Sequence, residues 1–162
     1  MHASDVQAAG PGGASRPAGC TCARLRRLTR RVSALYDREL AAVGLRVGQY
    51  SILMTLRHAA GAAGLGLGEA AERLDMDRTT LTRTLRPLAD AGWVEIGVDP
   101  DDARQRRLRL TADGGARLDA ARPHWRRAQL EVERLLGAAQ VASLHDWLDA
   151  TIPAFRPPGE DR

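Results

Sequence analysis

Short hydroxyl and guanidinium side chains are gathered between residues 78 and 86, where they alternate with leucines. Those that would fall on one side of a helix are Arg78, Thr79, Thr82, Arg83 and Arg86. A guanidinium group binds phosphate oxygens and can also address a guanine edge through two hydrogen bonds. These residue types are therefore suited to a nucleic-acid surface. An ordinary solvated helix face has the same composition, so this group needs support from a second one.

A second basic group follows an acidic turn at residues 99–102. Its arginines are Arg104, Arg106, Arg107 and Arg109. The acids that nearly cancel their charge are Asp99, Asp101 and Asp102. A carboxylate paired with a guanidinium group holds it in one orientation. We therefore interpret the acids as supports, and we predict that Asp102, Arg104 and Arg106 belong to a contact with the minor groove of DNA.

The overall composition agrees with an anionic partner but does not identify one. The 162 residues carry a formal net charge of +4, and 44% of them are hydrophobic, which is ordinary for a globular protein. All 24 basic residues are arginine, because the chain contains no lysine. This uniformity weakens the evidence from any single arginine. The positions of the arginines are therefore more informative than their number.

Hydrophobic periodicity predicts the elements that must position these groups. Helices are expected at about 20–43, 47–59, 67–74, 78–91, 112–136 and 138–152, and a hairpin of two strands at about 93–98 and 106–111. Gly44 and Gly92 should end helices, and Asp77 is suited to cap the helix after it. Residues 61–68 are typical of a loop, and Pro123 should kink or interrupt its helix. Composition predicts a flexible tail at 1–19 and a frayed end at 153–162.

This order of elements is that of a winged helix-turn-helix. In the helix at 78–91, Leu81, Leu85 and Leu88 lie on the face opposite the Arg and Thr residues. We therefore expect a mainly α fold with a small β-hairpin wing and a DNA-binding lobe at about 45–111. The helices at 20–43 and 112–152 carry more apolar surface than one lobe can cover. This surplus predicts a two-fold homodimer built on a helical dimerisation layer.

Residues 67–118 resemble the DNA-binding core of the MarR family of bacterial regulators. The pattern is L-x-x-x-G-W-V, then D-P-x-D-x-R, then L-T-x-x-G, and its residues here are Leu88, Gly92, Trp93, Val94, Asp99, Pro100, Asp102, Arg104, Leu110, Thr111 and Gly114. Residues 36–53 resemble the first two helices of the family, so the similarity extends over about residues 20–150. The family wing commonly has two adjacent arginines after its second aspartate, and here Ala103 replaces the first.

The resemblance implies an obligate homodimer that binds a pseudo-palindromic operator in double-stranded DNA. It also implies repression that a small molecule or an oxidant relieves. Tyr36, Tyr50 and Trp125 are our candidates for a pocket that holds a small aromatic effector.

Cys20 and Cys22 leave an oxidant signal as an alternative. The organic-peroxide sensors of the MarR family have a reactive cysteine near the start of the first helix and a tyrosine near its end, and Cys22 and Tyr36 have a similar separation. Because this separation is about 21 Å along a helix, the two could meet only across a dimer. A second tyrosine of that site would fall near Val47, where this chain has none. Two unreactive thiols at a helix start explain the residues at least as well.

Other function classes find less support in the sequence. We expect no metal site and no cofactor, because His58, His124 and His145 lack compact ligand spacing. No convergent nucleophile and base are visible, so we expect no enzyme. No apolar run approaches the roughly 18 to 20 residues that cross a bilayer, so we expect a cytoplasmic protein without a membrane partner. A winged-helix module that binds another protein in place of DNA is the main rival.

Overall fold

The computed structural model describes residues 19–59, 64–100 and 102–155. The helices are α1 (Thr21–Leu40), α2 (Val47–His58), α3 (Leu67–Arg73), α4 (Arg78–Asp90), α5 (Ala112–Leu136) and α6 (Ala138–Thr151). The strands are β1 (Leu65–Gly66), β2 (Val94–Val98) and β3 (Arg106–Leu110), and two 3-10 turns are η1 (Ala41–Val43) and η2 (Ile152–Phe155). The six expected helices and the mainly α fold are confirmed. The predictions for residues 1–18, 61–63 and 156–162, and the supporting role of Asp101, fall outside the described ranges.

The small sheet has three strands where the sequence predicted a hairpin of two. β3 lies in the middle, and β2 and β1 pair with it in antiparallel fashion on either side. In the added pair, Leu65 lies opposite Leu108. The prediction of a loop at Leu65 and Gly66 is therefore wrong. A two-residue strand is too short for an alternating pattern to reveal it.

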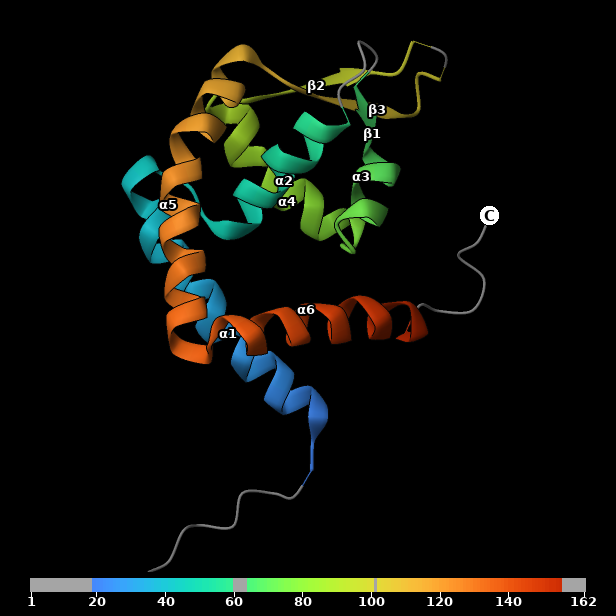
Figure 1. The fold of residues 1–162 in the computed structure, drawn as a ribbon. Coiled ribbons are helices and arrows are strands. Elements are labelled where there is room, and N and C mark those ends of the chain that lie inside the picture. Colours follow the sequence, from blue (N-terminus) through green and yellow to red (C-terminus); the bar gives the residue numbers. More distant parts are fainter. Residues whose placement is uncertain (1–18, 60–63, 101, 156–162) are drawn as a thin grey trace, which may run out of the picture.

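The helix-turn-helix and the sheet share one core, and α5 runs beside them from the wing towards α1 and α6 (Figure 1). Leu81, Leu85 and Leu88 of α4 are at most 1% exposed, as the helical period predicts. They belong to the same buried cluster as Ile52 and Leu53 of α2. The core therefore holds α4 by its leucine face and leaves the opposite face free. We call α1, α5 and α6 the helical layer.

Side-chain caps determine where α4 and α5 begin. Asp77 caps α4, as predicted, because its Oδ1 accepts a hydrogen bond from the backbone N–H of Thr80 at 2.8 Å. Thr111 caps α5 by accepting from the N–H of Gly114 at 3.0 Å. Gly44 follows η1 with φ of 67°, a left-handed conformation that favours glycine.

The helix α5 continues through Pro123 without interruption. Of the two predicted effects of Pro123, the interruption is therefore wrong, and the kink stays a prediction. Proline removes one backbone hydrogen bond, but α5 is held on both sides of it by Leu118, Ala121 and Ala128, which are fully buried. This packing compensates for the missing hydrogen bond.

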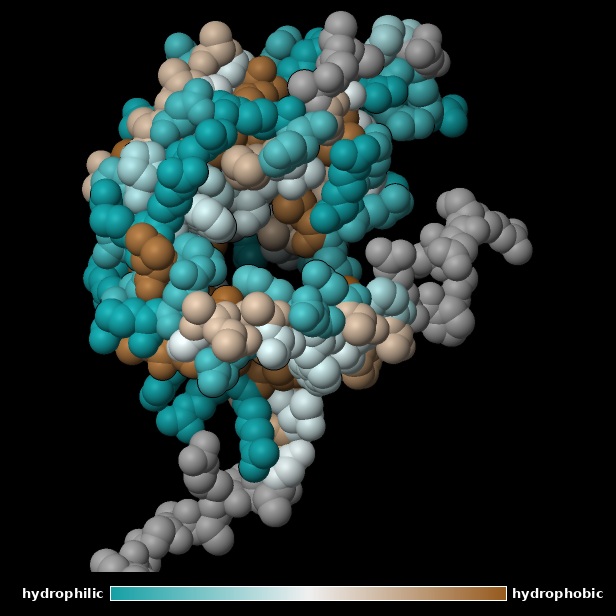
Figure 2. All heavy atoms as spheres, viewed as in Figure 1, coloured by the Kyte–Doolittle hydropathy of each residue, from teal (hydrophilic) through white to brown (hydrophobic). Residues whose placement is uncertain are grey.

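Large apolar side chains stay exposed on the helical layer and η2. They are Leu25, Leu28, Leu130, Leu135, Leu136, Trp147, Ile152 and Phe155. Figure 2 shows apolar residues at the surface along α5 and where α5 meets α6 and α1. Exposed apolar side chains that gather on one group of helices are typical of an interaction surface. In the described part of the chain, no helix combines the length and the apolar character that a membrane span requires.

Candidate nucleic-acid interface

The helix α4 presents the first predicted group to solvent on one face. All five of its members are exposed: Arg78, Thr79, Thr82, Arg83 and Arg86. At 100° per residue they fall within less than half of the helix circumference, opposite the three buried leucines. The hydroxyl of Thr82 donates to the carbonyl oxygen of Arg78 at 2.7 Å. Nε of Arg86 forms a long ion pair with Oδ2 of Asp90 at 4.0 Å. Both contacts lie within α4, so the face remains exposed to a partner.

A groove lies between the wing and the first residues of α3 and α4. Its volume is about 470 Å³, and it is lined by Gly66, Leu67, Gly68, Glu69, Arg78, Arg104, Gln105, Arg106 and Arg107. Arg78 of α4 and Arg104 and Arg106 of the wing therefore face one space, although they are distant in sequence. Within the described ranges, none of these three arginines takes part in an ion pair. Such a groove suits a phosphate backbone.

Asp102 shapes the backbone of the wing turn. Its Oδ1 accepts from the N–H of Arg104 at 3.0 Å, and its Oδ2 accepts from the side-chain amide of Gln105 at 3.2 Å. The sequence-based interpretation had Asp102 supporting a guanidinium group directly, and the structure corrects it. The short aspartate side chain lies two residues before a free N–H, where it closes a turn most readily. Asp102 thus positions the segment that carries Arg104.

The carboxylate that does support an arginine side chain is Asp99, which is 5% exposed. Its Oδ2 accepts from Nε of Arg107 at 2.5 Å, and Nη1 of Arg107 donates to the carbonyl oxygen of Gly64 at 3.3 Å. Oδ1 of Asp99 accepts from the N–H of Asp102 at 3.2 Å. Asp99 and Arg107 therefore join β2, β3 and the segment before β1. The sequence placed Asp99 among the supporting acids and Arg107 among the wing arginines, but it did not predict that these two residues pair with each other.

The four wing arginines do not form one surface, although the sequence suggested that they would. Successive residues of a strand point to opposite faces, so Arg107 and Arg109 lie on one face of β3 and Arg106 on the other. Nε of Arg109 is buried without a hydrogen-bond partner, and Arg109 lies opposite Glu95 in the sheet. The period of two along β3 is the signal that could have separated these residues. Arg104 and Arg106 remain as the exposed pair.

The three candidate pocket residues meet where α1, α2 and α5 pack together. Trp125 stacks on Tyr50 with ring centroids 6.0 Å apart, and it lies 6.4 Å from Tyr36. The hydroxyl of Tyr36 donates to Oε1 of Gln129 at 2.5 Å, and burial raises the pKa of both tyrosines. The rings contact one another in this protomer, and their binding of an effector stays a prediction.

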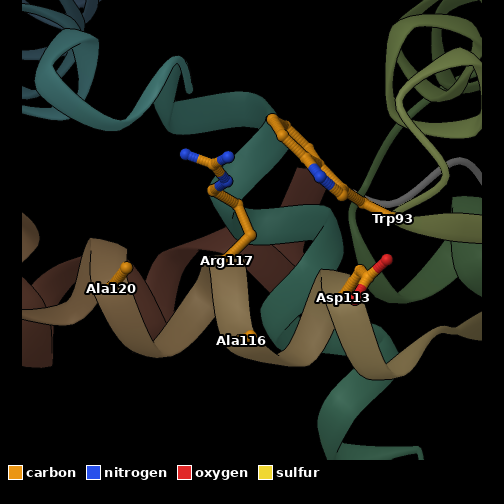
Figure 3. Close-up of a pocket in the computed structure, with 5 residues that line it drawn as sticks. All are labelled: Trp93, Asp113, Ala116, Arg117 and Ala120. Carbon is orange, nitrogen blue, oxygen red and sulfur yellow. The ribbon is translucent and has the colours of Figure 1, made fainter.

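A second hollow, of about 400 Å³, lies beside the start of α5 (Figure 3). Figure 3 shows Asp113, Ala116, Arg117 and Ala120 along α5, with Trp93 across the hollow. The guanidinium carbon of Arg117 lies 4.6 Å from the centroid of the Trp93 ring, and Nη1 donates to the carbonyl oxygen of Val43 at 3.1 Å. Arg117 therefore ties α5 to the end of α4 and to η1.

The two cysteines lie at the start of α1, and both are free and exposed. The helix begins at Thr21, one residue later than expected, so Cys20 is the N-cap residue with an extended backbone and Cys22 lies in the first turn. Nothing in these positions assigns them a reaction.

The same geometry occurs in proteins of known family. The model of the MarR family matches residues 43–105, a range that includes α2, α3, α4 and β2. The transcriptional regulator MosR from M. tuberculosis is similar to this chain, with 33% identity and a TM-score of 0.66 over 82% of this chain and 98% of MosR. No protein with a curated description matches the sequence significantly.

Two of the similar structures contain DNA. MosR in complex with DNA is 34% identical, with a TM-score of 0.66 over 82% of this chain and 98% of that chain. A mutant of MarR from E. coli in complex with operator DNA is 27% identical, with a TM-score of 0.71 over 81% of this chain and 93% of that chain.

Proposed function

Because this chain belongs to the MarR family of transcriptional regulators, we propose that it binds a pseudo-palindromic operator in double-stranded DNA as a homodimer and represses transcription. The observation that carries the proposal is the groove shared by Arg78, Arg104 and Arg106 beside the free face of α4. The DNA in the related MosR and MarR structures supports the same assignment.

The residues of α4 and the wing divide into two roles. The exposed face of α4 enters the major groove, where Thr82 and Arg83 reach base edges and specify sequence. Arg78, Thr79 and Arg86 bind phosphates and position the helix. The wing inserts Arg104 and Arg106 towards the minor groove, and Asp102 fixes the turn that presents them.

A two-fold dimer covers the exposed apolar residues of the helical layer. Covering them provides a hydrophobic interface of the kind that obligate dimers have. The same symmetry holds two copies of α4 about one turn of DNA apart, or roughly 34 Å. Removing the chain after Leu110 deletes α5 and α6 and should abolish the dimer. A full-length protein that is monomeric by light scattering at micromolar concentration would contradict this part of the proposal.

The signal that releases the operator is a small aromatic molecule held near Tyr36, Tyr50 and Trp125. This cluster connects α1 and α5 with α2 of the DNA-binding lobe, so a ligand there would change how the lobe sits on the helical layer. An oxidant is the second candidate signal. It is favoured by the exposure of Cys20 and Cys22, which leaves both free thiols accessible to a peroxide.

The experiment compares operator binding by wild-type protein and single variants, after selection of an operator from genomic fragments. Arg104→Ala should weaken binding without loss of folding, and Arg83→Ala or Thr82→Ala should also relax base preference, at about 1 to 3 kcal/mol per contact. Arg122→Ala, an exposed change on α5, is the control and should bind normally. Unchanged affinity in both Arg104→Ala and Arg83→Ala would remove the site assignment. A protein-binding module would show no salt-dependent DNA binding at all.

A further inference from the structure

The first part of α1 holds the strongest local excess of positive charge that the proposed function does not use. Between residues 21 and 36 the chain has five arginines and no acid: Arg24, Arg26, Arg27, Arg30 and Arg31. Their five charges exceed the formal net charge of +4, so the rest of the chain is net negative. The segment 64–111, which contains α4 and the wing, has more acids than arginines. The basic character of this protein is therefore located on α1.

These five side chains, which we call the arginine face, have no structural task within the protomer. All five are exposed, and in the described part of the chain none of them enters an ion pair. They also do not stabilise their own helix, because cations near a helix N-terminus oppose its dipole, and the first turn of α1 has no acid. Their concentration therefore indicates an external anionic partner.

The arginine face points away from the surface that a dimer would cover. At 100° per residue, the five arginines lie on one half of α1, and Leu25, Leu28, Val32 and Leu35 lie on the other. Leu25 and Leu28 are 44% and 43% exposed and belong to the apolar surface assigned to the dimer. The arginines thus stay accessible when that surface is covered. Figure 1 shows the N-terminal end of α1 at the opposite end of the protomer from the wing, and Figure 2 shows hydrophilic side chains projecting there.

We propose that the arginine face is a second binding surface for duplex DNA, separate from α4 and the wing, which contacts phosphates without reading sequence. Residues 24–31 extend over roughly 10 Å of helix. Duplex DNA has one negative charge per about 1.7 Å of its axis, so a duplex offers several phosphates to this row. Guanidinium groups bind phosphates through paired hydrogen bonds. The proposal depends on the proposed dimer in one respect, namely that the dimer covers the apolar side of α1 and leaves the arginine face accessible.

The same observations disfavour other anionic partners. An interfacial membrane helix must insert its apolar face, but Val32 and Leu35 are already half-buried within the protomer. A stable protein interface needs a buried apolar or aromatic centre, and the arginine face contains none. Phosphate backbones require only charge and hydrogen-bond donors.

The test uses full-length protein bound to an immobilised operator and measures capture of a second, labelled random duplex. Replacing all five arginines of the face by Gln, which keeps a good helix former, should reduce capture by about tenfold or more. The logarithm of the binding constant for random duplex falls linearly with the logarithm of the salt concentration. The variant should make this slope less steep by roughly 0.9 for each phosphate that it no longer binds. The control replaces five exposed arginines outside this face by Gln, and it should capture the second duplex as wild type does. Its positions are Arg73, Arg122, Arg126, Arg127 and Arg134.

Three results would overturn the proposal. Capture that is unchanged in the arginine-face variant would show that the face does not bind DNA. Loss of the dimer in that variant would mean that the arginines pair with carboxylates of the second copy. Binding of anionic lipid vesicles in preference to duplex would assign the face to membranes. The double variant Arg83→Ala, Arg104→Ala should lose operator binding but still bind random duplex through α1. A wrong assignment of the operator site can therefore be told apart from a wrong assignment of the arginine face.

Discussion

Gly114 lies so close to Trp93 that no side chain fits between them. A Cβ at Gly114 would overlap the carbonyl oxygen of Trp93 and lie 2.9 Å from Cδ1 of Leu110. The N–H of Thr111 donates to the same Trp93 carbonyl at 3.2 Å, and its hydroxyl donates to the carbonyl of Gly92 at 2.7 Å. The motifs G-W-V and L-T-x-x-G therefore pack against each other, because Thr111 and Gly114 of the second contact the carbonyl group of Trp93 in the first. This contact fixes the start of α5 against the end of α4.

Gly114→Ala should destabilise the fold, because the added methyl group meets backbone that cannot move away. Overpacking of this kind costs about 1 to 3 kcal/mol or more. Chemical denaturation of both variants is the measurement, with Gly115→Ala as the control. A Cβ at Gly115 would lie 3.7 Å from the nearest atom, on Arg57, so that variant should be unchanged or slightly more stable. Equal stability of the two variants would contradict the close contact.

Removal of Asp99 should loosen the wing. In Asp99→Ala, the guanidinium group of Arg107 loses its charged partner while it stays partly buried, and we expect a loss of about 2 kcal/mol in the free energy of unfolding, after allowance for the exposed part of Arg107. Operator affinity should fall as well, because Asp99 also holds the N–H of Asp102. Arg106→Gln is the control, since its side chain is exposed and should affect DNA binding without affecting stability. Normal stability of Asp99→Ala would refute a supporting role.

Asp77 should link the stability of α4 to pH in acid. Hydrogen bonds from Thr80 lower the pKa of Asp77 below its ordinary value of 3.8. Because the folded-state pKa is depressed, the contribution is fully present above the ordinary value and is lost as the pH falls through the folded-state pKa. Asp77→Asn keeps an acceptor oxygen but does not titrate. Its stability deficit relative to wild type should shrink between about pH 5 and pH 2, measured by urea denaturation. A deficit that stays constant over this range would exclude the linkage.

The sequence predicted those parts of the fold that local patterns determine. Leu81, Leu85 and Leu88 recur with the helical period, and Asp77 precedes the first turn of α4, so both the buried face and the cap could be identified. β1 could not, because Leu65 and Gly66 form a strand only through their pairing with β3. A pairing between distant segments leaves no local pattern.

The sequence predicted the types of residue in the site but not which of them contact each other. The acidic turn correctly indicated that a carboxylate supports a wing arginine. Four arginines follow this turn within a short segment, however. Only the folded sheet shows that Arg107 is the one that donates to Asp99. The groove that Arg78 and Arg104 both line likewise depends on how the wing packs beside the starts of α3 and α4. The sequence therefore indicated the residue types of the site, whereas the pairing of Asp99 with Arg107 and the separation of the wing arginines depend on the folded sheet.

The oxidant alternative predicts that a peroxide releases the operator by oxidising Cys22. Cys20 precedes α1 and Cys22 lies in its first turn, so the rule that two helical residues two apart point in different directions does not apply to them. Both thiols are exposed, but Cys22 lies within α1 of the helical layer, whereas Cys20 precedes it. Attack of its thiolate on the peroxide bond forms a sulfenic acid and releases the alcohol. A polar, oxidised side chain at this point would disturb the packing of α1 against the second copy.

Hydroperoxide should therefore release the operator from wild-type protein and from Cys20→Ser, but not from Cys22→Ser. Gel shift measures the release, and mass spectrometry identifies the modified thiol. Reduction by a small thiol should restore binding, because a sulfenic acid and the disulfide that follows it are both reversible. Release that persists in Cys22→Ser, or the absence of release in wild type, would eliminate the oxidant signal. A small aromatic molecule near Tyr36, Tyr50 and Trp125 would then be the better account of regulation.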